Sequence, residues 1–166
     1  MMRLNRQMQR LLTAQGIDPA AVQPSEDYPI WQKRDQAGRP YWGVSNFWGM
    51  DEDGVSGKKD LSRLEWDGNE VFFEAECPAE IPEMLRHAIG VMKGWKRTLE
   101  RAYPETPFVI FASYDDGSAL INIPKGCFAV TFRFWAPRDG EPVLNFESFD
   151  DWDQPALVEV CNLPEA

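Results

Sequence analysis

The fold of this chain is decided by the stretch from Ile81 to Tyr103, which reads IPEMLRHAIGVMKGWKRTLERAY. Its apolar residues recur at intervals of three and four, and this spacing predicts one long helix with a single apolar stripe. Pro82 falls in the first turn, where its missing N–H costs little, and Pro104 ends the helix. The stripe consists of Ile81, Leu85, Ala88, Met92, Trp95 and Leu99. We therefore expect a helix over about 80–103 that packs on a sheet.

The segment from Cys127 to Trp135 predicts the strand that receives this helix. Its residues alternate between two sets, the period-two pattern of a strand with one buried face. The apolar set is Phe128, Val130, Phe132 and Phe134. Other strands are predicted over 108–114, 119–123, 143–146 and 157–161, separated by turn sequences such as Asp115-Asp116-Gly117. The region 107–161 is thus expected to be an antiparallel sheet.

The region 28–77 also shows strand and turn patterns. Strands are predicted over 28–33 and 41–48, and again over 61–66 and 71–77. Asp67-Gly68 readily forms a type I′ turn, so the last two segments are expected to form a hairpin. In its second strand Val71, Phe73, Ala75 and Cys77 would face the core. Before these strands, the pattern predicts an N-terminal helix over about 2–15, ended by Gly16, and a helical turn starting at Asp18-Pro19.

These elements together predict an α+β fold. We expect an antiparallel sheet of about six to eight strands, with the long helix packed on it and a short N-terminal helix. Neither an internal repeat nor a Gly-, Ser- or Pro-rich linker divides the 166 residues, so 1–166 is treated as a single domain.

The composition of the chain limits the classes of protein to which it can belong. A chain with 43% hydrophobic residues can fold without disulfide bonds, and the three dispersed cysteines, Cys77, Cys127 and Cys161, are predicted to be buried thiols. No run approaches the roughly 20 apolar residues of a membrane span, and the N-terminus is polar. We therefore expect a cytoplasmic protein that does not associate with a membrane.

The charge of the chain is unevenly distributed. The net charge is −10; residues 1–103 hold 14 basic and 16 acidic residues, whereas residues 104–166 hold 3 basic and 11 acidic ones. Such a field repels phosphate backbones and attracts cationic surfaces. This distribution argues against nucleic-acid binding, and it favours either a basic protein partner or simple solubility.

Three acidic clusters occupy predicted loops, and aromatic residues accompany two of them. The clusters are Asp51, Glu52 and Asp53, which follow Trp48; Asp115 and Asp116; and Asp150, Asp151 and Asp153, which surround Trp152. Aromatic anchors beside carboxylates are typical of protein interfaces, so we interpret these residues as a partner-binding surface of an immunity or inhibitor type, which neutralises a basic partner such as a toxin. Turn formation and solubility are the simpler explanation. None of the clusters completes a calcium-binding loop, so no metal and no cofactor is predicted.

Catalysis has little support in the sequence. His87 is the only histidine, it falls within the long helix, and the ligand spacings of zinc sites are absent, as are the nucleophile elbow and the phosphate-binding loop. An alternative is a small-ligand-binding domain or a carboxylate-dependent hydrolase with a pocket lined by Trp42, Trp48 and Trp66. A structural or accessory protein is a further alternative. Arg133, Arg138 and Glu141 are expected to form a local ion pair or a site.

Overall fold

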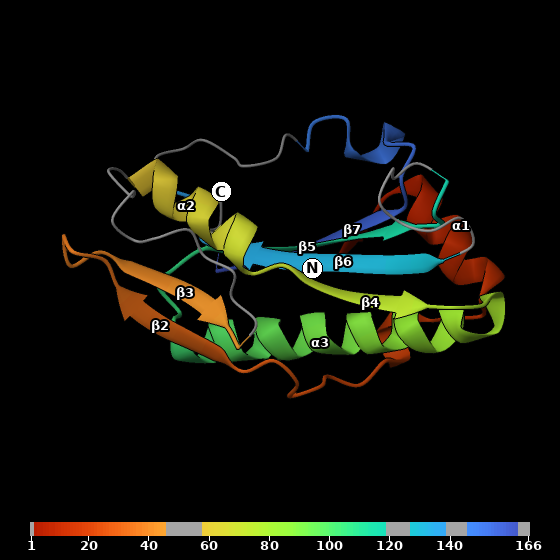
Figure 1. Cartoon of the computed structure of the whole chain (residues 1–166), viewed down its shortest axis with the longest axis horizontal. Helices are drawn as coiled ribbons and strands as arrows, with labels where there is room; N and C mark the ends of the chain where they lie inside the picture. The colour runs from red at the N-terminus through yellow and green to blue at the C-terminus, as the bar shows by residue number, and fades with distance from the viewer. Residues whose placement is uncertain (1, 46–57, 119–126, 139–145, 163–166) are drawn as a thin grey trace.

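The computed structural model describes residues 2–45, 58–118, 127–138 and 146–162 (Figure 1). The strands are β1 (Arg3–Leu4), β2 (Ile30–Arg34), β3 (Pro40–Val44), β4 (Val71–Ala75), β5 (Phe108–Asp115), β6 (Phe128–Trp135) and β7 (Ala156–Cys161). The helices are α1 (Arg6–Ala14), α2 (Lys58–Gly68) and α3 (Ile81–Ala102), and the short 3-10 turns are η1 (Pro19–Ala21), η3 (Pro78–Glu80) and η4 (Phe149–Asp151).

The seven strands form two antiparallel sheets. Five of them make the main sheet in the order β1-β7-β5-β6-β4, and β2 pairs with β3 in a separate hairpin. The predicted α+β class and antiparallel pairing are confirmed, although the strands do not all belong to one sheet. Strands β1 and β4 are the two edges of the main sheet.

Helix α3 covers one face of this sheet, as predicted (Figure 1). Every residue of the predicted apolar stripe is buried. The Trp95 ring lies 5.1 Å from the rings of both Phe132 and Phe134, so the helix packs directly on the alternating residues of β6. Burying aromatic side chains of this size contributes most of the core's hydrophobic stabilisation.

The opposite face of the sheet carries a second apolar cluster, which the sequence patterns did not predict. Buried residues of β5, β6 and β7 meet aromatic side chains from α2 and from the segment around η4. The cluster contains Val109, Phe111, Trp135, Phe149, Ala156 and Val158, with Trp66, Phe146 and Trp152 packed against it. Both faces of the sheet are therefore partly covered.

The predicted hairpin over 61–77 is wrong, because its first half is helix α2 rather than a strand. Leu61, Leu64, Glu65 and Gly68 are buried at helical spacing, so one helical face meets the end of β6 and the β2–β3 hairpin. Only Val71–Ala75 of the predicted second strand is extended. Asp67-Gly68 ends a helix instead of forming a tight turn.

The N-terminal helix begins later than predicted. It spans Arg6–Ala14, because the side chain of Asn5 caps it by accepting a hydrogen bond of 2.8 Å from the backbone N–H of Met8. Residues Arg3–Leu4 form β1 and pair with β7. The predicted helical turn after Asp18 is present as η1, with Asp18 as its cap.

Two of the three cysteines differ from the prediction. Cys161 is buried, Cys127 is half-buried and Cys77 is exposed. Strand β4 ends at Ala75, so Cys77 leaves the sheet and begins the turn η3 instead of entering the core. The strands predicted over 119–123 and 143–145 lie outside the described residues, and Phe146 is not in a strand.

Candidate functional site

A hollow that we call the acidic hollow lies at the end of the main sheet where β5 stops and β7 starts. Strands β5 and β7 are antiparallel neighbours, so the turn after β5 meets the segment that leads into β7. The backbone N–H of Tyr114 donates to the carbonyl of Pro155 at 2.8 Å and joins the two segments. The acidic hollow has a volume of about 350 Å³ and is lined by Tyr114, Asp115, Asp116, Ser118, Asp153, Gln154 and Pro155.

Turn hydrogen bonds hold the carboxylates of the acidic hollow in place. Oδ1 of Asp115 accepts from the backbone N–H of Gly117 at 2.6 Å, and Oδ1 of Asp116 accepts from the backbone N–H of Ser118 at 3.0 Å. Gly117 has a φ of 77°, a left-handed conformation that glycine adopts without strain. The hydroxyl and backbone N–H of Ser118 lower the pKa of Asp116, so this carboxylate is ionised at neutral pH.

Tyr114 forms the inner wall of the acidic hollow. It is the last apolar-face residue of β5, and it is buried in the main core. Burial, together with the negative charges of Asp116 and Asp115, raises the pKa of Tyr114 to about 12. The phenol is therefore neutral at every physiological pH, and the charge of the hollow comes from its carboxylates.

The acidic hollow unites residues from two of the three predicted acidic clusters. Asp115 and Asp116 come from one cluster and Asp153 from another, almost 40 residues away in the chain. Among the described residues that line it, none is a lysine or an arginine. A cation that entered the hollow would therefore meet the carboxylates of Asp116 and Asp153 and the largely buried carboxylate of Asp115, without a competing basic group from the described lining.

Asp150 and Asp151 stand apart from the hollow and face the N-terminal segment. Arg3 of β1 approaches Asp150 at 3.2 Å, and Arg6 of α1 approaches Asp151 at 3.5 Å. Exposed pairs of this kind contribute little to stability, about 0–1 kcal/mol each, but the two arginines offset the charge of both η4 carboxylates. These two predicted binding residues are therefore weaker attractors than Asp153.

Trp152 packs against the second apolar cluster. Its ring stacks on that of Phe146 at 6.0 Å and meets that of Phe149 at 5.2 Å. Because it is half-buried, part of its surface remains beside the acidic residues of the same segment. Trp48, Asp51, Glu52 and Asp53 lie outside the described residues.

The structure does not bring together the described tryptophans of the predicted pocket, Trp42 and Trp66. Trp42 packs on Tyr103 and Phe108 in the core beneath α3. Trp66 packs on Trp135, in the cluster on the other face of the sheet. Since the sheet separates these two indoles, they do not line a common cavity.

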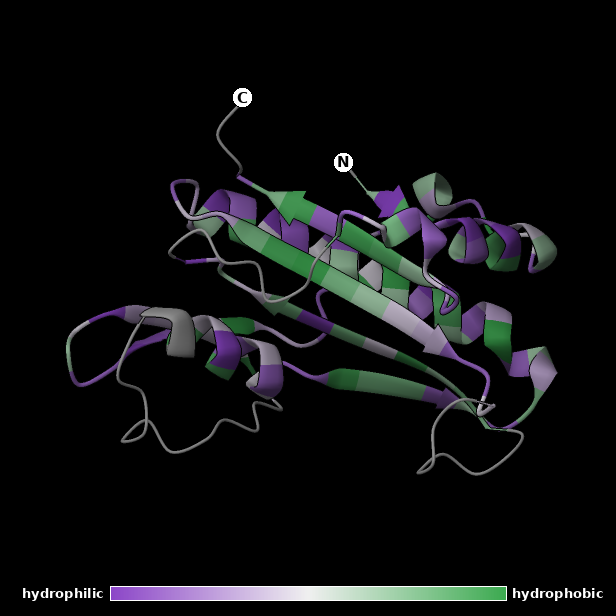
Figure 2. Cartoon of the chain, turned by 90° about the horizontal axis from the view of Figure 1, so that it is seen from above, coloured by the Kyte–Doolittle hydropathy of each residue, from purple (hydrophilic) through white to green (hydrophobic). Residues whose placement is uncertain are grey.

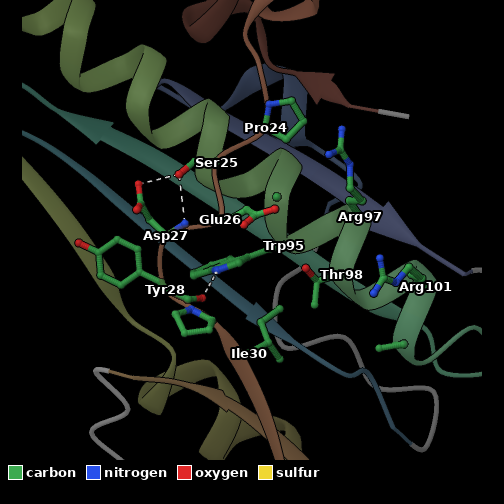
Figure 3. A pocket seen from close by; sticks show the side chains of 13 residues that line it. Pro24, Ser25, Glu26, Asp27, Tyr28, Ile30, Trp95, Arg97, Thr98 and Arg101 are labelled. Atoms are coloured by element: carbon green, nitrogen blue, oxygen red, sulfur yellow. Dashed lines mark hydrogen bonds between the residues drawn. The ribbon is translucent and has the colours of Figure 1, made fainter.

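A second hollow, which we call the α3 hollow, was not predicted. It lies between residues 24–30 and the C-terminal half of α3 and has a volume of about 360 Å³ (Figure 3). The Trp95 indole forms its floor and donates to the carbonyl of Tyr28 at 2.9 Å. Arg97 and Arg101 stand on one side of it, and Asp27 and Tyr28 on the other (Figure 3).

Two glycines of α3 allow the segment 24–30 to lie against the helix. A Cβ at Gly94 would be 1.7 Å from the carbonyl oxygen of Ser25, and one at Gly90 would be 3.0 Å from that of Gln23. The backbone N–H of Ser25 also donates to the carbonyl of Gly90 at 2.8 Å. The spacing of four residues between Gly90 and Gly94 was the sequence signal for this close approach.

The buried polar residues of the core form a structural network. Oε1 of Glu65 lies 2.6 Å from the Arg138 guanidinium, and the carboxylate also accepts from the backbone N–H groups of Trp42 and Ala136. Burial raises the pKa of Glu65, and the charge and hydrogen bonds of Arg138 act against this rise. The pair ties α2 to the ends of β3 and β6. Arg133 pairs separately with Glu70, and Glu141 lies outside the described residues.

The described residues contain no group of three or more His, Cys, Asp or Glu side chains placed to hold a metal ion. His87 is exposed on α3, with its ring 4.3 Å from that of Phe73 and its Nε2 3.5 Å from Asp27.

Among the described helices, none is both long and apolar enough to cross a membrane. Comparisons with protein families, curated proteins and solved structures find no match to this chain.

Proposed function

We propose that this chain is a protein-binding domain whose acidic hollow receives a basic segment of a partner protein, as an inhibitor or immunity protein would. The observation that carries the proposal is that Asp115, Asp116 and Asp153 line one hollow, whose described lining contains no lysine or arginine. Opposite charge accelerates the encounter of two proteins and selects against partners of the wrong sign.

The size and shape of the acidic hollow favour a side chain over a whole folded surface. A volume of about 350 Å³ accommodates one or two long side chains or a small ligand. An arginine fork can bind two carboxylate oxygens at once, and the Tyr114 and Pro155 surfaces would cover its apolar stem. We therefore expect an arginine or lysine of the partner to be the central contact.

The acidic end of the sheet extends beyond the hollow. Glu74 of β4 and Asp115 of β5 are cross-strand neighbours of the same β6 residue, Ala129, so both carboxylates belong to one row of the sheet. Glu76 and Glu80 follow at the end of β4 and are exposed. These carboxylates at one end of the sheet support the attraction of a basic surface around the central contact.

Affinity purification tests the proposal. The tagged protein is recovered from its native cells at low salt, the co-purifying proteins are identified by mass spectrometry, and the wash is repeated at high salt. A stoichiometric basic partner that dissociates as salt rises is the expected result, because screening weakens attraction between exposed charges. A partner that is acidic, or whose binding does not respond to salt, would contradict the proposal.

The α3 hollow favours a second function, the binding of a small ligand. Its volume of about 360 Å³ exceeds the lower limit for small-molecule sites, roughly 300 Å³, and it combines an aromatic floor with charged groups of both signs. A zwitterionic ligand would match Arg97 and Arg101 on one side and Asp27 on the other. Thermal-shift screening of zwitterionic metabolites tests it, with the variant Arg97→Ala as the control that should lose any stabilisation.

A further inference from the structure

Strand β4 is an edge of the main sheet, and among the described residues it has a neighbouring strand on one side only. The order β1-β7-β5-β6-β4 leaves β4 paired on one side only, with β6. No backbone hydrogen bond to Val71–Ala75 from outside the sheet occurs among the described residues. Figure 2, which looks down on the sheet, shows β4 at its margin with no described element beyond it. Half of the backbone groups of this strand therefore point toward a position that no described residue occupies.

This edge carries fewer of the features that normally prevent strand pairing than the opposite edge does. Proteins protect sheet edges with very short strands, prolines, bulges, covering loops or charged side chains, lysine above all. The opposite edge, β1, is protected in this way: it has two residues, includes Arg3, and leads at once into α1. In contrast, β4 reads Val-Phe-Phe-Glu-Ala and pairs with β6 in an unbroken five-residue register.

The side chains on the open face of β4 are apolar at the centre and acidic beside it. Phe72 is 56% exposed and is the only large hydrophobic side chain in the described part of the chain that is exposed. Its cross-strand neighbour is Thr131, too small to cover the ring. Glu74 lies on the same face as Phe72 because side chains alternate along a strand, and Glu70 directly precedes the first residue of β4. Glu70 is paired with Arg133, whereas Glu74 is exposed and has no cationic partner among the described residues.

We propose that β4 is a docking edge that accepts an extended segment of another protein as a sixth strand, with an apolar residue beside Phe72 and basic residues at alternate positions beside Glu74. Main-chain hydrogen bonds would supply affinity, and the alternate side chains would supply specificity. A second copy of this chain is disfavoured as the occupant. Antiparallel pairing that aligns Phe72 with its counterpart would also place Glu74 opposite Glu70 of the other copy. Glu74 is also one of the carboxylates at the end of the sheet that holds the acidic hollow, whereas Phe72 is not, so Phe72→Ala tests the docking edge separately from the hollow.

The test uses the peptide acetyl-Thr-Lys-Val-Ile-Val-Lys-Thr-amide, in which both lysines and the isoleucine share one face. Isothermal titration calorimetry with the full chain should show one-to-one binding, and Phe72→Ala or Glu74→Lys should weaken it about tenfold or more. Glu105→Lys, the same charge change far from the edge, should leave it unchanged. Two further versions of the peptide carry N-methyl groups on alternate backbone amides. In one version the methyl groups block the N–H groups along one edge of the peptide strand, and in the other version they block those along the opposite edge.

One methylated isomer should bind at least about tenfold more weakly than the other, because only one edge of the peptide hydrogen-bonds to β4. Equal affinity of the two isomers would overturn the proposal, as would unchanged binding to Phe72→Ala. The absence of binding up to about 1 mM peptide would also overturn it. Concentration-dependent dimerisation in sedimentation experiments that Glu74→Lys strengthens would assign the edge to a second copy and likewise overturn it.

Discussion

The backbone N–H of Tyr114 donates to the carbonyl of Pro155 at 2.8 Å, and this bond joins two acidic segments that are far apart in the chain. It continues the β5–β7 ladder by one step beyond the last paired residues, Ser113 and Ala156. The ladder thus places Asp116 and Asp153 beside the same hollow. The pairing of β5 with β7 therefore brings the charged residues of the candidate site together.

Tyr114 should make stability depend on pH in the alkaline range. Its pKa is about 12 in the folded protein, against about 10 in an unfolded chain, so folding holds its proton more tightly. This contribution is complete below pH 10 and is lost as the pH rises from 10 toward 12. Urea unfolding at pH 8, 10 and 11 should show a smaller alkaline loss of stability in Tyr114→Phe than in the parent protein. Identical pH profiles would contradict the assignment.

The three cysteines should react with a thiol reagent at different rates. Cys77 is exposed, Cys127 is half-buried, and burial together with the charge of Glu100 raises the pKa of Cys161 to about 12. Because the thiolate is the reactive form, Cys161 should stay unmodified at pH 8 until the protein is denatured. A chromogenic disulfide reagent should therefore titrate Cys77 first, and Cys77→Ser should remove the fastest phase. Rapid modification of all three thiols in the native protein would show that the core is not packed as described.

Arg138→Met should destabilise the protein strongly. It removes the partner of Glu65, whose carboxylate is fully buried, and an uncompensated buried charge costs about 3–5 kcal/mol. Arg63→Met is the matched control, because Arg63 pairs with Asp67 at the surface of α2 and such pairs contribute about 1 kcal/mol or less. Equilibrium urea denaturation measures both. Equal losses in the two variants would mean that the buried pair is not what ties α2 to the sheet.

Gly94→Ala should displace the segment 24–30 from α3. The new Cβ would lie 1.7 Å from the carbonyl oxygen of Ser25, a distance that the backbone must relieve by moving. Gly90→Ala, with its nearest contact at 3.0 Å, should have a smaller effect, and elsewhere in a helix such a change stabilises by up to about 1 kcal/mol. Amide hydrogen exchange at Ser25, which donates to Gly90, should be faster in Gly94→Ala. Protection that is unchanged in both variants would contradict the close approach.

The long helix and the strand it covers could be predicted because their patterns are long and regular. Trp95 falls within a stripe that repeats through about five turns, and Phe132 within an unbroken period-two run. Helix α2 was missed because the apolar residues of Leu61–Trp66 fit both a short strand and a helix turn. The Asp67-Gly68 pair then favoured the wrong alternative.

The carboxylates of the candidate site could be singled out from the sequence, but their grouping could not. Asp153 joins Asp115 only because β7 lies next to β5, and strand order does not follow from local patterns. The same limit concealed the pairing of Asp150 with Arg3, which depends on β1 lying beside β7. Long-range pairing, rather than residue type, separates the carboxylates that have an arginine partner from those that have no basic partner among the described residues.

The most direct test of the central claim compares two double variants that remove the same charge. Asp116→Asn with Asp153→Asn neutralises the acidic hollow, and Glu26→Gln with Glu105→Gln neutralises two exposed carboxylates elsewhere. Titration calorimetry with the basic partner at low salt should show binding weakened about tenfold or more by the first variant and little changed by the second. Equal weakening by both variants would mean that binding depends only on the net charge of the protein, and it would contradict a binding site at the acidic hollow.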